Sequence, residues 1–170
     1  MSPLTGRGLA VAALVVLLDQ VTKWWIVNIV MMPPEVIEVV PFFNLVLTWN
    51  RGVSFGMFNS GSPLNAWILG VVAVGIAGSL LVWLMRVDRM ILALALGLIV
   101  GGAVGNLIDR VRFGAVADFL DVHALGYHWP AFNVADSAIT IGVVVLIADS
   151  LFGSAERRKT NQGLGKEAGK

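Results

Sequence analysis

Several acidic side chains of this 170-residue sequence lie within or beside long apolar stretches, where charged groups are costly and usually functional. Asp118 and Asp136 stand out because neither has a Lys or Arg at helical spacing toward a common site, and a chain reversal between them could bring them together. Two adjacent carboxyl groups do not both ionise easily, so one keeps a proton while the other stays charged. Such a pair can activate water for attack on an amide bond. The pattern alone also permits a structural role for both residues.

Other polar residues in the apolar stretches recur at helical spacing and form stripes. Asp19 and Lys23 are four residues apart, the spacing of an ion pair within one helix. Two further stripes consist of Asn106, Asp109 and Arg110, and of Asn133, Asp136, Ser137 and Thr140. The asparagines in them are expected to form hydrogen bonds between helices. The expected ion pairs are Asp19 with Lys23, Asp109 with Arg110 or Arg112, and Asp149 with Arg157 or Arg158.

Two other motifs could carry different chemistry. Residues 52–56 spell G-x-S-x-G, the nucleophile-elbow pattern, but that motif needs a large α/β sheet that this chain cannot build. His123 and His128 could bind zinc with Asp121 nearby, but their spacing suits no single helical face and the sequence has no H-E-x-x-H motif. The chain has no cysteine and hence no thiolate. We therefore expect neither a metal nor another cofactor.

Four apolar segments must position these groups. Each is long enough to cross a hydrocarbon layer about 30 Å thick, and they run from Leu9 to Ile29, Leu64 to Met85, Met90 to Ile108 and Val134 to Phe152. Hydrophobic residues make up 57% of the chain and charged residues 14%, against roughly 25% charged in soluble domains. The sequence predicts a mainly α-helical integral membrane protein with four transmembrane helices. Its net charge of +1 gives no basic field that would attract nucleic acid.

The helices divide the chain into a membrane domain, residues 1–152, and a polar cytoplasmic tail, residues 153–170. Lys and Arg accumulate on the cytoplasmic side of membranes, and their distribution here places both termini there and the two long connections outside. The first connection, about residues 30–63, has alternating, β-branched and aromatic residues, which predict a small external β-sheet cradle at the membrane surface. The second, about residues 109–133, indicates no particular structure.

Connectivity alone should gather the polar stripes. If four helices alternate in direction, the third helix ends and the fourth begins at the same membrane surface, and Asp19 with Lys23 lies in the same half. Asp118 joins them from the second connection. Gly97 and Gly101, followed by Gly105, recur every four residues on the third helix, a pattern typical of close helix packing.

Five short segments, in this order, resemble the signature of the lipoprotein signal peptidase family, also called signal peptidase II. They are DQVTK (Asp19 to Lys23), NRGVSF (Asn50 to Phe55), GNLIDR (Gly105 to Arg110), ADF (Ala117 to Phe119) and FNVADS (Phe132 to Ser137). The resemblance covers nearly everything from Asp19 to Ser137. Five ordered segments are far more specific than any one of them.

The resemblance implies that Asp118 and Asp136 are the catalytic pair of an aspartic endopeptidase. The supporting or substrate-binding residues that it implies are Asp19, Lys23, Asn50, Gly52, Asn106, Asp109, Arg110, Asn133 and Ser137. The implied substrate is a bacterial prolipoprotein whose cysteine carries diacylglycerol, cut just before that cysteine. The implied location is the bacterial cytoplasmic (inner) membrane, with the active site near the outer surface and membrane lipids around it, and a monomer is expected. Two alternatives stay open: a proton or ion carrier that uses the intramembrane carboxylates, and a scaffold without catalysis.

Overall fold

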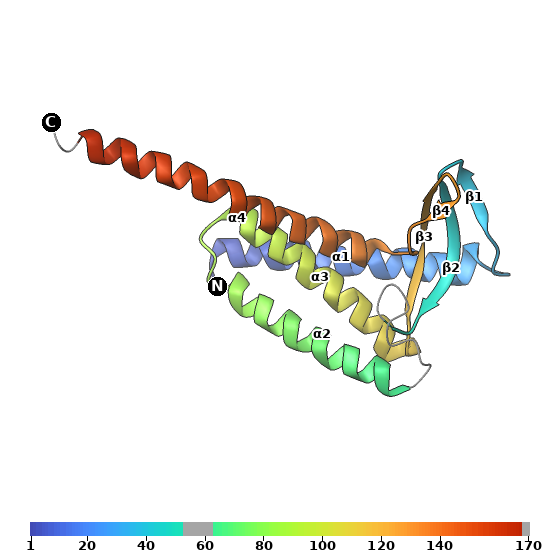
Figure 1. Ribbon diagram of the computed structural model, residues 1–170. Coiled ribbons are helices and arrows are strands. Elements are labelled where there is room, and N and C mark those ends of the chain that lie inside the picture. Colours follow the sequence, from blue (N-terminus) through green and yellow to red (C-terminus); the bar gives the residue numbers. More distant parts are fainter. Residues whose placement is uncertain (53–62, 168–170) are drawn as a thin grey trace.

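The computed structural model describes the backbone of residues 1–52 and 63–167 and the side chains of residues 1–52 and 70–152. Its helices are α1 (Pro3–Trp25), α2 (Pro63–Leu84), α3 (Met90–Phe113) and α4 (Val134–Glu167), and a π-helical turn, η1 (Ile26–Val30), extends α1. The helices lie side by side, with a sheet across one end of the bundle (Figure 1). α3 is the central helix because it packs against α1, α2 and α4. The structure is therefore mainly helical, as predicted.

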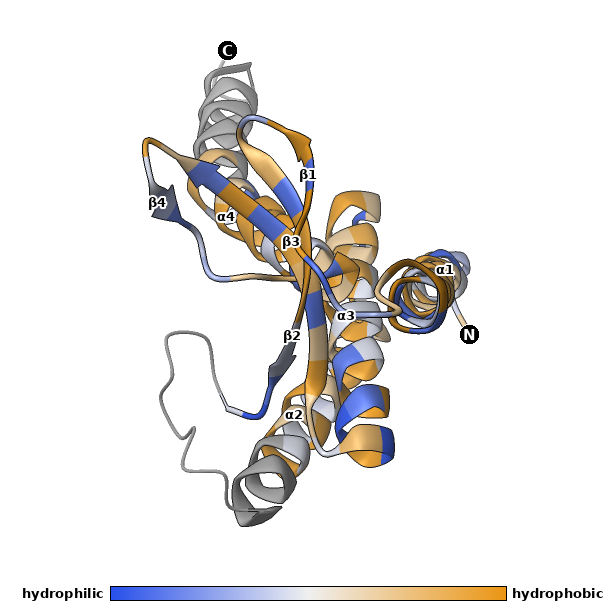
Figure 2. Ribbon diagram, turned by 90° about the vertical axis from the view of Figure 1, so that its right-hand side faces the viewer, coloured by the Kyte–Doolittle hydropathy of each residue, from blue (hydrophilic) through white to orange (hydrophobic). Residues whose placement is uncertain are grey.

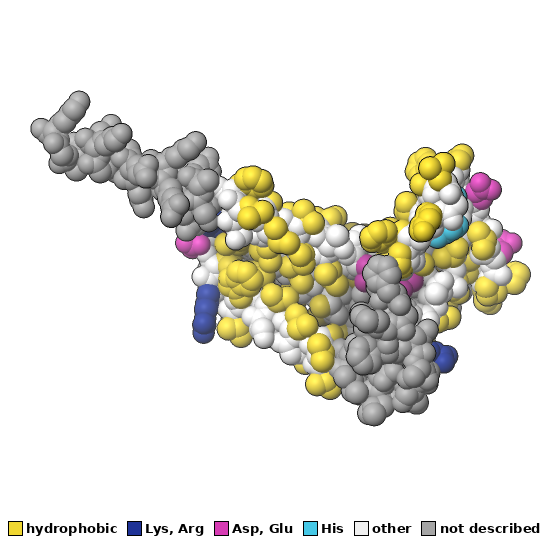
Figure 3. Space-filling view, in the orientation of Figure 1, with side chains coloured by type: hydrophobic (Ala, Val, Ile, Leu, Met, Phe, Trp, Pro, Cys, Tyr) yellow, Lys and Arg dark blue, Asp and Glu magenta, His cyan; other side chains and the backbone are white. Residues whose placement is uncertain are grey.

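The surface of the bundle is apolar. Within the described residues, three stretches are long and apolar enough to cross a membrane: Pro3–Val30, Met90–Phe113 and Val134–Phe152. A shorter apolar stretch, Gly70–Leu84, lies in α2. Leu17, Val71 and Ile147 are each more than half exposed, and hydrophobic side chains cover the visible flank of the bundle (Figure 3). Continuous exposure of this kind is unfavourable in water, so lipid is the expected solvent of this surface.

Three helix ends lie beyond the predicted segments. α4 continues past Phe152 to Glu167, into the predicted tail. The other two extensions have local reasons. α1 begins at Pro3, earlier than expected, because the Ser2 hydroxyl caps its first turn and proline fits the first helical position. α3 continues past its apolar segment to Phe113, so its polar last turns are helical too. It ends at Gly114, whose φ of 67° is the left-handed conformation that favours glycine after a helix.

The sheet has four antiparallel strands in the order β1-β2-β3-β4. They are β1 (Ile37–Val40), β2 (Phe43–Asn50), β3 (Val116–Ala124) and β4 (Tyr127–His128). β2 and β3 pair although α2 and α3 separate them in the sequence, and the register places Thr48 opposite Asp118. A buried cluster of Ile26, Met31 and Phe119 anchors the sheet to the end of α1. The predicted small sheet is confirmed, and the second connection contributes two of its strands.

α1 and α3 approach closely along the predicted glycine stripe. A Cβ atom at Gly105 would lie 2.6 Å from Asp19 Oδ2, and one at Gly101 would lie 2.7 Å from the Ala12 carbonyl oxygen. Gly97 likewise faces the backbone of α1. Since no side chain fits at these positions, the packing role predicted for the stripe is confirmed. Gly105 also lets the Asp19 carboxylate lie directly against α3.

Candidate active site

The candidate site lies where the sheet meets the helix ends. Hydrophilic residues of α3 gather at its sheet end (Figure 2). Asp118 on β3 is buried, and Asp136 in the first turn of α4 is half-buried. Asn133 contacts both, because its Nδ2 donates to Asp118 Oδ1 at 2.7 Å and its backbone N–H donates to Asp136 Oδ2 at 3.2 Å. The structure thus brings together the two carboxyl groups that the sequence singled out.

The way α4 begins fixes the position of Asp136. Asn133 Oδ1 accepts a hydrogen bond from the Asp136 backbone N–H at 2.9 Å, while Asp136 accepts one from the Asn133 backbone N–H. This reciprocal arrangement is a capping box. Asp19 Oδ1 accepts a hydrogen bond from the Ala135 N–H at 3.0 Å, so α1 also holds this helix end. Asp136 therefore lies at the positive end of the α4 helix dipole.

Side-chain amides give each carboxyl group a further donor. Asn50 Nδ2 donates to Asp118 Oδ2 at 3.0 Å. The Gly52 N–H donates to Asn50 Oδ1 at 3.1 Å and so turns the amide nitrogen of Asn50 toward Asp118. Asn106 Nδ2 donates to Asp136 Oδ1 at 2.8 Å. Each carboxyl group is therefore held on both of its oxygens.

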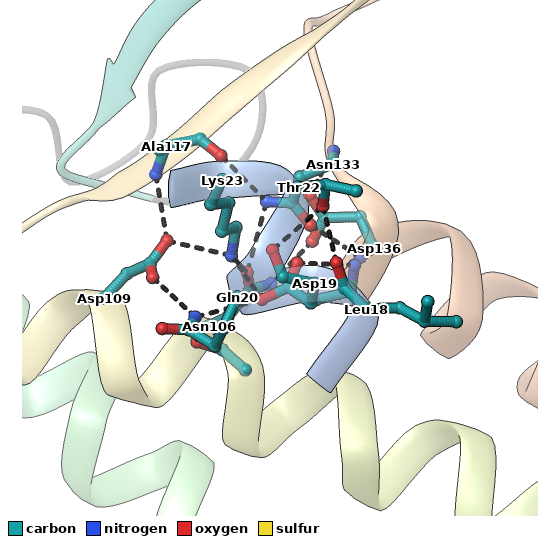
Figure 4. Close-up of polar contacts among 12 residues, drawn as sticks. Leu18, Asp19, Gln20, Thr22, Lys23, Asn106, Asp109, Ala117, Asn133 and Asp136 are labelled. Atoms are coloured by element: carbon teal, nitrogen blue, oxygen red, sulfur yellow. Dashed lines mark hydrogen bonds and ion pairs between the residues drawn. The ribbon is translucent and has the colours of Figure 1, made fainter. Parts of the chain in front are cut away.

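Lys23 is buried beside this pair and links α1 to α3 (Figure 4). Its Nζ lies 2.9 Å from Asp19 Oδ2 and 2.8 Å from Asp109 Oδ2, and it donates to Asn106 Oδ1 at 2.9 Å. The predicted ion pair of Asp19 with Lys23 is confirmed. Asp109 also accepts a hydrogen bond from the Ala117 N–H at 3.2 Å, which ties α3 to β3.

One predicted ion pair is corrected, and another acidic residue has a partner that the sequence did not indicate. Asp109 pairs with Lys23 rather than with Arg110 or Arg112, because consecutive helical residues point in different directions and Asp109 faces α1. Asp149 pairs with Arg89, whose Nη1 lies 2.6 Å from Asp149 Oδ2. Its predicted partners, Arg157 and Arg158, lie outside the described side chains. The pairing with Arg89 brings together the start of α3 and α4 at the bundle end away from the sheet, a contact between helices that spacing within one helix cannot reveal.

Arg110 and Ser137 lie at the edge of the site. Arg110 Nη1 donates to the Asn106 carbonyl oxygen at 3.4 Å, and its charge is near enough to act on Asp118 and Asp136. The Ser137 hydroxyl donates to the Asn133 carbonyl oxygen at 3.0 Å. Among the described side chains, no Lys or Arg lies within the 4.0 Å of an ion pair from Asp118 or Asp136. The pair keeps the freedom to exchange protons that a direct salt bridge would remove.

Asp118 is suited to hold a proton. Burial and the neighbouring charge of Asp136 raise the pKa of Asp118 from 3.8 to about 7, against the opposing effects of Asn50, Asn133 and Lys23. A neutral carboxylic acid at this position can donate a proton near neutral pH.

This raised pKa predicts a pH-dependent stability. Because the folded protein binds the Asp118 proton more tightly than the unfolded chain does, its stabilising effect is full below pH 3.8 and is lost as the pH rises through about 7. We expect the free energy of unfolding to fall by up to about 4 kcal/mol across that range, and Asp118→Asn to flatten the slope. Thermal unfolding in detergent from about pH 4 to pH 8 measures it. If the free energy of unfolding of the variant had the same pH dependence as that of wild type, Asp118 would not be the group with the raised pKa.

A second polar cluster lies on the outer part of the sheet. His123 and His128 are paired across β3 and β4, with ring centroids 4.7 Å apart. His128 Nδ1 lies 2.9 Å from both oxygens of Asp121, and Asn44 Nδ2 donates to Asp121 Oδ2 at 3.0 Å. Burial raises the pKa of Asp121, but the hydrogen bonds from His128 and Asn44 outweigh it and lower the pKa overall. Helical spacing could not reveal this pairing, because a hairpin turn creates it.

One residue of the site did not emerge from the sequence analysis. Gln20 lies between Asp19 and Asp109, and its side-chain amide donates to both carboxylates. The sequence feature that could have indicated Gln20 is its polar side chain within an apolar helix, three positions before Lys23. The serine of the G-x-S-x-G motif, Ser54, lies outside the described residues.

A pair of amide-held carboxyl groups at the end of an apolar helix bundle is the arrangement expected of a membrane aspartic peptidase. The family model described as "Signal peptidase (SPase) II" matches residues 11–152. The chain therefore belongs to the signal peptidase II family.

Named relatives and solved structures agree with this family. A lipoprotein signal peptidase from Methylobacterium sp. (strain 4-46) is 46% identical over 149 residues, covering 87% of this chain and 90% of that protein. Another, from Methylobacterium radiotolerans, is 41% identical over 164 residues and covers 95% of each chain. A solved bacterial membrane enzyme is 35% identical, with a TM-score of 0.77 over 89% of this chain and 91% of its own. A second has a TM-score of 0.74 at 34% identity, over 86% of this chain and 94% of its own.

Proposed function

We propose that this protein removes signal peptides from diacylglyceryl-modified bacterial prolipoproteins by cutting just before the lipid-bearing cysteine. The observation that carries the proposal is the carboxyl pair of Asp118 and Asp136, joined through Asn133 at the end of an apolar bundle. Relatives that cover most of the chain are lipoprotein signal peptidases. The carrier alternative loses support because Asp19 and Asp109, two of its candidate carboxylates, are both bonded to Lys23.

In the proposed mechanism, Asp136 is the base and Asp118 is the acid. The Asp136 carboxylate, held by the Asn106 side chain and the Asn133 backbone N–H, takes a proton from a water molecule. The resulting hydroxide attacks the carbonyl carbon before the cysteine, while Asp118 donates its proton to the carbonyl oxygen. Collapse of the tetrahedral intermediate breaks the C–N bond, and the cysteine nitrogen leaves with a proton returned by Asp136. In the same collapse, the hydroxyl group that becomes the new carbonyl oxygen gives its proton to Asp118, so both residues return to their starting protonation states.

The proposed arrangement in the membrane has four crossings, with both termini in the cytoplasm and the active site near the outer surface. Support comes from the bundle, since the N-terminus lies at the end remote from the sheet and α4 runs toward that same end (Figure 1). The helices are apolar along their length, and acidic side chains are visible where the bundle meets the sheet (Figure 3). Each oxygen of the two carboxyl groups has a donor within one chain, so the proposed site is complete in a monomer.

The acyl chains should supply much of the substrate recognition. A lipid-anchored cysteine holds its scissile bond at the depth of the carboxyl pair, so an unlipidated prolipoprotein should lose turnover as well as affinity. We expect a loss of at least about 100-fold in kcat/KM, because misplacing the amide by about 1 Å spoils the attack geometry. The test compares one prolipoprotein with and without its diacylglyceryl group in the same detergent. Comparable kcat/KM values would show that the enzyme recognises the peptide and not the lipid.

A further inference from the structure

The side-chain amide of Gln20 lies between α1 and α3 (Figure 4). It contacts Asp19 and Asp109, the two carboxylates that pair with Lys23. Its Nε2 donates to Asp109 Oδ1 at 2.9 Å, and to Asp19 Oδ2 and the Gly105 carbonyl oxygen at 3.2 Å each. An amide nitrogen has two hydrogens, so these acceptors share them. Gln20 thus ties both carboxylates to one point of the α1–α3 contact.

This contact divides the oxygens of Asp109 between two donors. Oδ1 faces Gln20, while Oδ2 faces the Lys23 ammonium group at 2.8 Å. Asp19 Oδ2 lies 2.9 Å from the same ammonium group. With the two carboxylates fixed, the remaining ammonium hydrogen is directed at Asn106 Oδ1, 2.9 Å away.

The position of Lys23 sets the direction of the Asn106 amide. An ammonium group only donates, so the Asn106 atom that faces it must be the oxygen. Asn133 Nδ2 donates to that same oxygen at 3.2 Å. The Asn106 nitrogen therefore points the other way, toward Asp136 Oδ1 at 2.8 Å. A reversed amide would place donor against donor at Lys23 and oxygen against carboxylate at Asp136.

We propose that Gln20 is a positioning residue for the peptidase reaction: by fixing Asp19 and Asp109 it holds Lys23 against Asn106 and keeps a hydrogen-bond donor on Asp136. The inference rests on the proposed function. A cavity of about 30 Å³ adjoins Gln20, Lys23 and Asp109, enough for one or two water molecules. Shortening or removing the Gln20 amide would let water reach Lys23 and compete with Asn106. The other charged groups near this network are Arg110, Arg112 and Asp118.

The test is Gln20→Met, which keeps the length of the side chain and removes the amide. We expect kcat to fall about tenfold on a diacylated prolipoprotein, as for a lost hydrogen bond to a charged group. KM should stay unchanged, because the proposed role of Gln20 is to position Asn106 and not to bind substrate. Thr22→Val is the matched control, because among the described side chains the Thr22 hydroxyl bonds only to carbonyl oxygens of its own helix.

A second variant tests the positioning role of Gln20 if Gln20→Met does not fold. Gln20→Glu has the same shape but places a third carboxylate beside Lys23. As the pH falls, the introduced carboxyl group is protonated and gains a hydrogen that it can donate. The activity of this variant relative to wild type should therefore rise as the pH falls. A pH-independent ratio would overturn the proposal, as would a Gln20→Met enzyme with normal kcat or one in which KM changes instead of kcat. A wild-type protein that cleaves no diacylated prolipoprotein would instead overturn the proposed function.

Discussion

Replacing either Asp118 or Asp136 by Asn is expected to reduce kcat on a diacylated prolipoprotein by at least about 10³-fold, within the range contributed by acid–base groups. The substitution keeps the size of the side chain and removes the proton that each residue must give or take. The Asp136 change removes the base that activates water, and the Asp118 change removes the acid beside the carbonyl oxygen. Turnover is measured with purified protein in detergent at several pH values.

The matched control for these variants is Asp88→Asn, which changes an exposed acidic residue. It should cleave at the wild-type rate. Thermal unfolding should show that both active-site variants remain folded. A folded Asp118→Asn or Asp136→Asn protein with near-normal turnover would remove that residue from the chemistry.

Lys23→Met is expected to produce the largest loss of stability, about 3–5 kcal/mol. The substitution leaves the Asp19 and Asp109 carboxylates buried and facing each other without the ammonium group that now contacts both. It also removes the donor that orients Asn106. The free energy of unfolding in detergent measures the effect.

Arg86→Met, at an exposed cation, is the control for that change and should cost less than about 1 kcal/mol. Adding Asp109→Asn to Lys23→Met should recover part of the stability, because it removes one of the two uncompensated charges. Equal small losses for Lys23→Met and Arg86→Met would show that the buried lysine does not hold the helices together.

Much of this fold could be predicted because a lipid environment restricts which residues a helix can carry. Apolar length predicts the helices, and the rarity of polar groups within them makes each one informative. The pair of Asp19 with Lys23 followed from spacing within one helix. The convergence of Asp118 and Asp136 followed from connectivity and the expected reversal of the chain between them.

The rest depends on contacts that no local pattern contains. β3 has buried residues at almost every position from Val116 to Asp121, so it lacks the alternation that would reveal a strand. It pairs with β2, although α2 and α3 lie between the two strands in the sequence. The choice of Lys23 over Arg110 as the partner of Asp109 depends on which helix faces each residue, and Gln20 gains its role only from the close approach of α1 and α3.

The central claim is that this carboxyl pair cuts a diacylated prolipoprotein before its modified cysteine. The most direct measurement is mass spectrometry of the products that purified wild-type and Asp136→Asn proteins release from such a substrate. The account predicts that the wild type yields a free signal peptide and a mature chain beginning at the lipid-bearing cysteine, and that the variant leaves the substrate intact. Cleavage at another bond, or the same products from the folded variant, would contradict it.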